Sequence, residues 1–201
     1  MDYVRAQSAN NRQSPLYGRV GSMSAAMGHS EGGVASLIAA DQALLNNSYS
    51  SNFSTVVDLS GCFPPYDEAA DVGVKHEKIP ILFITGSQDC ICTPQKNLDF
   101  YDDSISPCRY YANLIDGSHC FFANPGPVDG VLCYDLEVLL GCGFVTKIPK
   151  DTQLQRVLDL TVPWLQWQLK GMTTARKTFD ATLQLYQKEG KLTFQSQCPS
   201  S

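Results

Sequence analysis

The chain has 201 residues, of which 43% are hydrophobic and 17% are charged, and its formal net charge is −5 at pH 7. This composition is typical of a globular protein and predicts a single domain over residues 1–201. The negative charge and the lack of a dense cluster of Lys and Arg exclude a nucleic-acid-binding surface, and no apolar run approaches the roughly 20 residues of a membrane span.

The apolar runs alternate along the chain between short segments typical of buried strands and longer segments with helical spacing. The first strand leads through a glycine-rich turn into a helix that carries Val34, Leu37, Ile38 and Leu45 near helical spacing. This alternation predicts a mostly parallel sheet with helices on its faces, a three-layer α/β/α sandwich. The predicted strands cover residues 20–27, 53–60, 79–86 and 109–117, and the predicted helices cover 31–47, 93–104, 151–171 and 174–189.

The last two predicted helices carry the aromatic and aliphatic side chains expected to cover one side of the sheet. Trp164 and Trp167 are interpreted as packing residues rather than as a platform for substrate. In the final helix, Phe179, Leu183 and Tyr186 are expected to point inward. The buried face predicted for the helix over 151–171 consists of Leu154, Val157, Leu158, Val162, Leu165 and Leu169.

Three residues with the chemistry of a nucleophile, an acid and a base follow three of the predicted strands. Ser30 follows the first strand, Asp89 the third and His119 the fourth. Because functional residues of a parallel sheet gather at the carboxyl ends of its strands, we expect these side chains to lie at the same edge. Their order along the chain is that of enzymes with a nucleophile elbow.

The segment GHSEG around Ser30 has the glycine spacing of a sharp turn from a strand into a helix. Gly28 and Gly32 are predicted to let the two backbones approach closely, which would hold Ser30 in a strained conformation with its hydroxyl exposed. The following helix begins at Glu31, and its dipole and the Glu31 backbone N–H are expected to stabilise a developing oxyanion.

A serine hydroxyl is a poor nucleophile until a base accepts its proton. His119 is the proposed base, and Asp89 is the proposed acid that would fix the His119 tautomer and stabilise the imidazolium. The chain also offers rival acids and histidines, which are Asp102, Asp103, Asp116, His29 and His76.

The remaining histidines and the apolar segment after His119 suggest a substrate pocket. His29 lies inside the turn itself and is interpreted as part of the pocket wall, whereas His76 lies in a polar stretch expected at the surface. The segment over 120–144 is apolar, and its Phe121 and Phe122 are expected to wall the pocket nearest the histidine. Plain packing is the alternative interpretation of this segment.

Eight cysteines, an even number, indicate disulfides and an oxidising compartment, although the first residues carry no signal-peptide pattern. We therefore expect a secreted or endomembrane-lumenal protein. A zinc site is the alternative, but a CxC spacing is atypical of zinc, and no metal is expected. The plausible disulfides are Cys90 or Cys92 with Cys108, and Cys133 with Cys142, and the alternative zinc ligands are Cys90, Cys92, Cys108 and Cys120.

The segments MGHSEGG, ILFITGSQDCICTP and LIDGSHCFFA resemble the nucleophile, acid and histidine motifs of the α/β-hydrolase superfamily. They are most similar to its dienelactone-hydrolase-like, chlorophyllase-like and secreted polyester-hydrolase (cutinase-like) branch. The resemblance extends from about residue 17 to the helix that ends in VPWLQWQLKG. It implies hydrolysis of small-molecule or polymeric carboxylic esters through an acyl-enzyme, without a metal or an organic cofactor.

The start of the chain departs from this family pattern. Members place several strands and an oxyanion loop before the nucleophile, whereas 29 residues precede Ser30, which is room for one strand at most. We therefore expect an N-terminally incomplete fold, the C-terminal two-thirds of the usual one, with one oxyanion donor missing and an exposed first strand. The alternatives to an esterase are a non-catalytic or inactive remnant, and a thioesterase or peptidase on the same fold.

Overall fold

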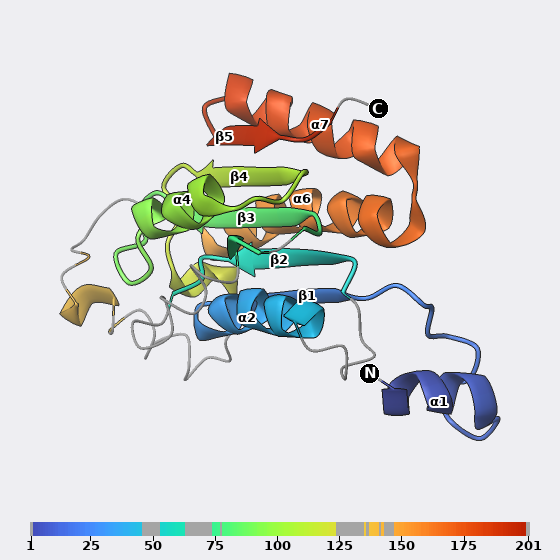
Figure 1. The fold of residues 1–201 in the computed structure, drawn as a ribbon. Helices are drawn as coiled ribbons and strands as arrows, with labels where there is room; N and C mark the ends of the chain where they lie inside the picture. The colour runs from blue at the N-terminus through green and yellow to red at the C-terminus, as the bar shows by residue number, and fades with distance from the viewer. Residues whose placement is uncertain are drawn as a thin grey trace.

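One sheet organises the part of the chain that the computed structural model describes, which is residues 2–45, 53–62, 74–76, 78–123, 135, 137–140, 142 and 147–199. Within these residues the sheet has five strands in the order β1-β2-β3-β4-β5 (Figure 1). The strands are β1 (Ala25–His29), β2 (Thr55–Leu59), β3 (Ile81–Gly86), β4 (Arg109–Leu114) and β5 (Leu192–Gln197). The predicted mostly parallel α/β architecture is confirmed.

The first four strands run parallel, and β5 runs antiparallel to β4. The carboxyl ends of β1 to β4 therefore lie at one edge of the sheet, where the loops after each strand meet. β5 is a strand that the sequence pattern does not predict. In β5 Leu192 is buried and the residues after it are mostly exposed, whereas every residue of β2 and β3 is buried.

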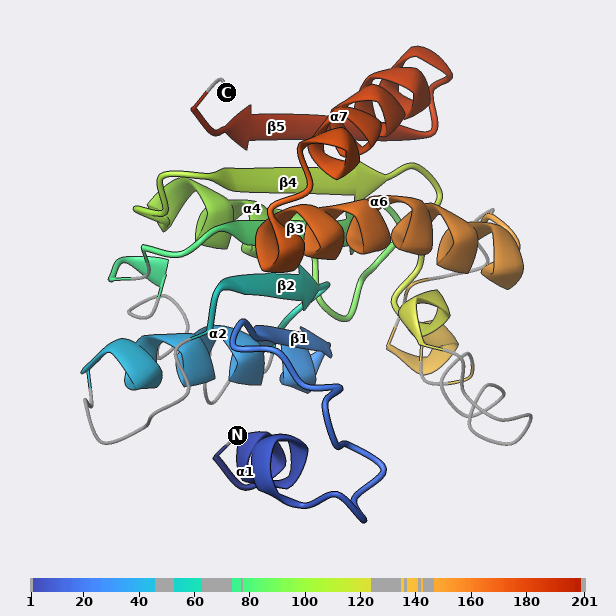
Figure 2. The same ribbon diagram turned by 90° about the vertical axis from the view of Figure 1, so that its right-hand side faces the viewer.

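Helices cover both faces of the sheet, as Figures 1 and 2 show from two directions. On one face α2 packs against β1 and β2, and α4 packs against β3 and β4; α6 and α7 lie on the other face. Within the described residues no helix is both long and apolar enough to cross a bilayer. The helices are α1 (Asp2–Asn10), α2 (Glu31–Leu45), α4 (Pro94–Asp103), α6 (Lys150–Lys170) and α7 (Thr173–Lys188), with a short 3₁₀ turn η2 (Cys120–Phe122).

Alternate side chains of the central strands divide the core into two layers. In β2, Val57 packs toward α6 and α7, while its neighbour Val56 packs toward α2 and α4. The larger layer is centred on Trp164 of α6, which is fully buried and contacts Tyr110 and Phe179. Its indole N–H donates to the Thr55 hydroxyl at 2.9 Å. Both tryptophans are packing residues, as predicted, since Trp167 packs edge-to-face against Trp164.

Two details of the predicted elements are wrong. The first strand begins at Ala25 rather than at residue 20, because its partner β2 begins at Thr55 and pairs with Ala25, so the preceding residues have no strand beside them in the described part of the chain. In α6, Leu158 and Val162 are 52% and 45% exposed instead of buried. The stripe that α6 does bury includes two polar residues, and it consists of Gln153, Val157, Leu160, Thr161, Pro163 and Trp164.

The described cysteines form disulfides, but the predicted pairs are wrong. Cys108 lies at the amino end of β4, on the opposite edge of the sheet from Cys90 and Cys92, so those residues cannot reach it. Cys120 is also disulfide-bonded, and Cys133 lies outside the described residues. The bonds between described cysteines include Cys62–Cys92, Cys90–Cys142 and Cys108–Cys198. Such bonds are compatible with an extracellular or lumenal location.

Candidate active site

Ser30 lies in the turn between β1 and α2, in a backbone conformation that L-residues rarely adopt. Its φ is +59°, and its N–H donates to the carbonyl of Leu59 in the neighbouring strand β2. A Cβ on Gly28 would lie 2.0 Å from the carbonyl oxygen of Gly32, so only glycine fits at position 28. The same turn places Glu31 at the start of α2, which aims the amino end of that helix toward Ser30.

The predicted reason for Gly32 is wrong. A Cβ at this position would meet nothing within 4 Å, and Gly32 contributes its backbone, which Gly28 approaches. The second tight position is Gly33, where a Cβ would lie 2.1 Å from the Asp58 carboxylate. The sequence GHSEGG contains both glycines, so spacing alone does not indicate which one is constrained.

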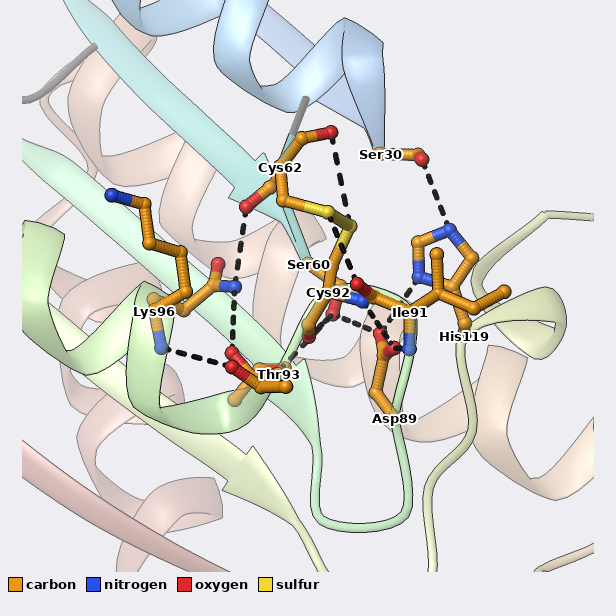
Figure 3. The surroundings of a disulfide bond; sticks show 12 residues. Ser30, Ser60, Cys62, Asp89, Ile91, Cys92, Thr93, Lys96 and His119 are labelled. Carbon is orange, nitrogen blue, oxygen red and sulfur yellow. Dashed lines mark hydrogen bonds and ion pairs between the residues drawn. A yellow bond between two sulfur atoms is a disulfide. The ribbon is translucent and has the colours of Figure 1, made fainter. Parts of the chain in front are cut away.

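The structure brings Ser30, His119 and Asp89 together in one chain of hydrogen bonds (Figure 3). The Ser30 Oγ lies 3.0 Å from Nε2 of His119, and the other ring nitrogen, Nδ1, lies 2.7 Å from Oδ2 of Asp89. Because an ionised carboxylate only accepts, Nδ1 carries the proton and Nε2 is left to accept from the serine hydroxyl. The arrangement can take a proton from Ser30 while the carboxylate stabilises the resulting imidazolium.

Asp89 is buried and has a donor at each carboxylate oxygen. Oδ1 accepts from the backbone N–H groups of Ile91 at 2.9 Å and Cys92 at 2.7 Å, and Oδ2 accepts from the Ser60 hydroxyl at 2.5 Å in addition to His119. The Cys62–Cys92 disulfide joins this acid loop to the loop after β2 (Figure 3). These contacts fix the orientation of the carboxylate toward His119.

The rival acids lie elsewhere. Asp103 forms an ion pair with Lys75 at 3.0 Å, with both side chains about half exposed, and Asp102 is exposed beside it at the end of α4. Asp116 has a φ of +58° in the turn after β4, where its carbonyl accepts from Ile148. Asp89 is thus the candidate that contacts a histidine of the site.

Side chains that the sequence analysis did not single out hold the His119 loop on both sides. Gln153 of α6, which is fully buried, accepts from the Ser118 N–H and donates to the Ser118 carbonyl. Glu137 accepts from the Cys120 N–H and forms a buried ion pair with Lys147. No sequence signal indicates these roles, because Gln153 is not part of the apolar face predicted for its helix and Glu137 lies in a segment without a predicted element.

Two of the candidate pocket residues, His29 and Phe122, lie in a row beside the His119 ring. His29 has its ring centre 4.5 Å from that of His119 and 5.8 Å from that of Phe122, which is buried, whereas Phe121 is half-buried. Burial, followed by the charge of His119, lowers the pKa of His29 to about 4. His76 lies far from this group and pairs with Asp41 at 3.7 Å. Most of the segment over 124–144 lies outside the described residues.

The low pKa of His29 predicts a pH dependence of stability. His29 takes up a proton near pH 4 in the folded chain and near pH 6.5 in the unfolded chain. The neutral His29 therefore contributes to the free energy of unfolding fully above pH 6.5, and this contribution is lost as the pH falls toward 4. It amounts to at most about 3 kcal/mol. Urea unfolding at pH 7.0 and 4.5 measures how much free energy of unfolding is lost between the two pH values. This loss should be smaller in His29→Gln, whose side chain takes no proton, than in the unchanged chain. Equal losses in the variant and the unchanged chain would contradict the prediction.

A serine at a positive-φ turn after a parallel strand, hydrogen-bonded to a histidine and through it to an aspartate, defines the α/β-hydrolase type of serine hydrolase. A family model described as Serine hydrolase (FSH1) matches residues 14–121, which is more than half of the chain. The chain therefore belongs to the serine hydrolase (FSH1) family. No curated protein matches it by sequence.

Within the described residues, no group of three or more His, Cys, Asp or Glu side chains could hold a metal ion. The four cysteines of the alternative zinc site, Cys90, Cys92, Cys108 and Cys120, are all in disulfides.

Proposed function

We propose that this serine hydrolase cleaves carboxylic esters, with Ser30 as nucleophile, His119 as general base and Asp89 as the acid that orients it. The observation that carries the proposal is the continuous chain of contacts from Ser30 Oγ to His119 Nε2 at 3.0 Å and from His119 Nδ1 to Asp89 Oδ2 at 2.7 Å. Both distances are within the reach required for proton transfer. The resemblance of the three motifs to dienelactone-hydrolase-like and cutinase-like enzymes supports an ester as the substrate.

The reaction proceeds in two halves. Ser30 Oγ attacks the ester carbonyl carbon as its proton passes to His119 Nε2, and the negative charge collects on the carbonyl oxygen near the Glu31 N–H. When the tetrahedral intermediate collapses, the bond to the alkoxide leaving group breaks, and His119 returns the proton to that oxygen. Water then attacks the acyl-enzyme with His119 again as base, releasing the carboxylic acid and restoring the Ser30 hydroxyl.

A panel of substrates with one acyl group tests the ester preference. The purified chain should hydrolyse p-nitrophenyl butyrate faster than a butyryl thioester or butyryl p-nitroanilide at equal concentrations, and the Ser30→Ala variant should hydrolyse none of them above background. Faster turnover of the thioester or the anilide would identify a thioesterase or a peptidase instead. A folded chain that is inert toward all three would support the non-catalytic alternative.

We further propose that the protein works in a secretory or extracellular compartment on small-molecule or polymeric esters. Two of its disulfides, Cys62–Cys92 and Cys90–Cys142, involve the loop that carries Asp89, so their formation bears directly on the site. Disulfides of this kind persist in oxidising compartments. The proposed reaction uses neither a metal nor an organic cofactor, because serine, histidine and backbone donors supply each step.

A further inference from the structure

Ser60 is the second serine at the carboxyl edge of the sheet with a positive φ. It follows β2 directly with a φ of +51°, it is fully buried, and its N–H donates to the Ile84 carbonyl of β3 at 2.8 Å. Non-glycine residues rarely adopt this region, and such strain persists where the surrounding structure fixes it. The conformation turns the hydroxyl toward the acid loop (Figure 3).

The Ser60 hydroxyl contacts the same oxygen of Asp89 that His119 contacts. Ser60 Oγ lies 2.5 Å from Asp89 Oδ2, and His119 Nδ1 lies 2.7 Å from that atom. The ionised carboxylate has no proton to give, so Ser60 is the donor, and Asp89 is its near acceptor because the Cys92 carbonyl lies 3.5 Å away.

A third hydroxyl completes the arrangement. Thr85 of β3 is fully buried, and its Oγ1 lies 3.1 Å from Ser60 Oγ. Since the proton of Ser60 is already donated to Asp89, Thr85 must be the donor in this second contact. The hydroxyls of Thr85 and Ser60 therefore form a directed chain of hydrogen bonds that ends on the carboxylate, and each bond polarises the next.

We propose that Ser60, oriented by Thr85, is a positioning residue that sets how strongly Asp89 holds the protonated form of His119. This inference rests on the proposed function. Two backbone N–H groups donate to Oδ1 of Asp89, whereas Oδ2 accepts from Ser60 and from His119. Its hydrogen bond draws negative charge away from the contact with Nδ1 and keeps that oxygen in line with the ring.

Removing the hydroxyl has two expected consequences. The carboxylate becomes less fixed, so kcat for p-nitrophenyl butyrate falls roughly tenfold in Ser60→Ala, while KM stays within about twofold. The carboxylate also keeps more charge at Oδ2 and holds the imidazolium more firmly. The acid limb of the pH profile of kcat/KM therefore moves to higher pH, by about 0.5 pH unit.

The Ser60→Gly variant distinguishes the effect of losing the hydroxyl from the effect of the strained backbone. Glycine adopts the positive φ without cost, so this variant relieves the strain while removing the same hydrogen bond. The proposal expects Ser60→Gly and Ser60→Ala to show the same fall in kcat and the same shift of the acid limb. The Thr85→Val variant should show a smaller change in the same direction, because Ser60 keeps its own proton.

Ser106→Ala provides a matched control. Ser106 is fully buried as well and donates to the Ile79 carbonyl at 2.7 Å, but it lies just before β4, at the opposite edge of the sheet from Asp89. Its loss should lower the melting temperature while leaving kcat and the pH profile unchanged.

The experiment measures pH profiles of kcat and kcat/KM for p-nitrophenyl butyrate with the full disulfide-bonded chain and these variants, beside Ser30→Ala. An unmoved acid limb in Ser60→Ala and Ser60→Gly would overturn the proposal, as would a normal kcat in the glycine variant. If Ser30→Ala hydrolyses the ester like the unchanged chain, the proposed function itself fails, and that outcome is distinct because it does not depend on Ser60.

Discussion

Replacing Ser30 by alanine should lower kcat for an activated ester by roughly 10⁶-fold, to the background rate. The hydroxyl is the atom that forms the acyl-enzyme, and no other described hydroxyl lies within hydrogen-bonding distance of His119 Nε2. His119→Ala should cost about as much, because without the base the Ser30 hydroxyl keeps its proton. Steady-state hydrolysis of p-nitrophenyl butyrate measures both effects.

The two residues should act as one unit. The Ser30→Ala/His119→Ala double variant is expected to be no slower than either single variant, since each alone stops the same step. Matching circular dichroism spectra would show that the variants remain folded. A Ser30→Ala variant that retains more than about a hundredth of the kcat would contradict the assignment of the nucleophile.

The largest effect on stability is expected at Trp164. Its side chain is fully buried between the sheet and α7, where it contacts Tyr110 and Phe179, and its indole N–H donates to the Thr55 hydroxyl. Truncation to alanine removes this packing and leaves a cavity, so the free energy of unfolding should fall by about 3–5 kcal/mol. Urea unfolding under non-reducing conditions measures the change.

Two variants of α6 serve as references for this measurement. Trp164→Phe keeps most of the ring volume but loses the donor to Thr55, so its loss should be intermediate. Val162→Ala alters a side chain that is 45% exposed on the same helix and should change the free energy of unfolding by less than about 0.5 kcal/mol. A loss below about 1 kcal/mol in Trp164→Ala would mean that α6 is not anchored through this residue.

The sequence predicts the sheet and the meeting of the three site residues because both depend on local patterns. The β-branched run of β2 and the continuous apolar run of β3 are typical of buried strands, and parallel strands bring the residues that follow them to one edge. Ser30, Asp89 and His119 each follow such a strand, so their proximity follows from topology. The turn at Ser30 is equally local, since the clash at Gly28 arises within five residues.

Features that depend on contacts distant in the chain were not predicted. β5 has few apolar residues, and it pairs with β4 although α6 and α7 lie between the two strands in the sequence. Because β5 was not predicted, the Cys108–Cys198 bond was not predicted either. Ser60 is the last residue of the strand predicted over 53–60, so the sequence places it at the functional edge but does not indicate its contact with Asp89. The buried face of α6 includes Gln153 because its amide satisfies the Ser118 backbone, which an apolar pattern cannot reveal.

Labelling with a fluorophosphonate probe tests the central claim most directly, because the phosphorus reacts only with a serine whose hydroxyl is activated by its base. The full chain should acquire one label, which peptide mass spectrometry should place on Ser30, and the His119→Ala variant should remain unlabelled. A folded chain that takes no label, or takes it at another serine, would contradict the account and identify a hydrolase fold whose Ser30 is not a nucleophile.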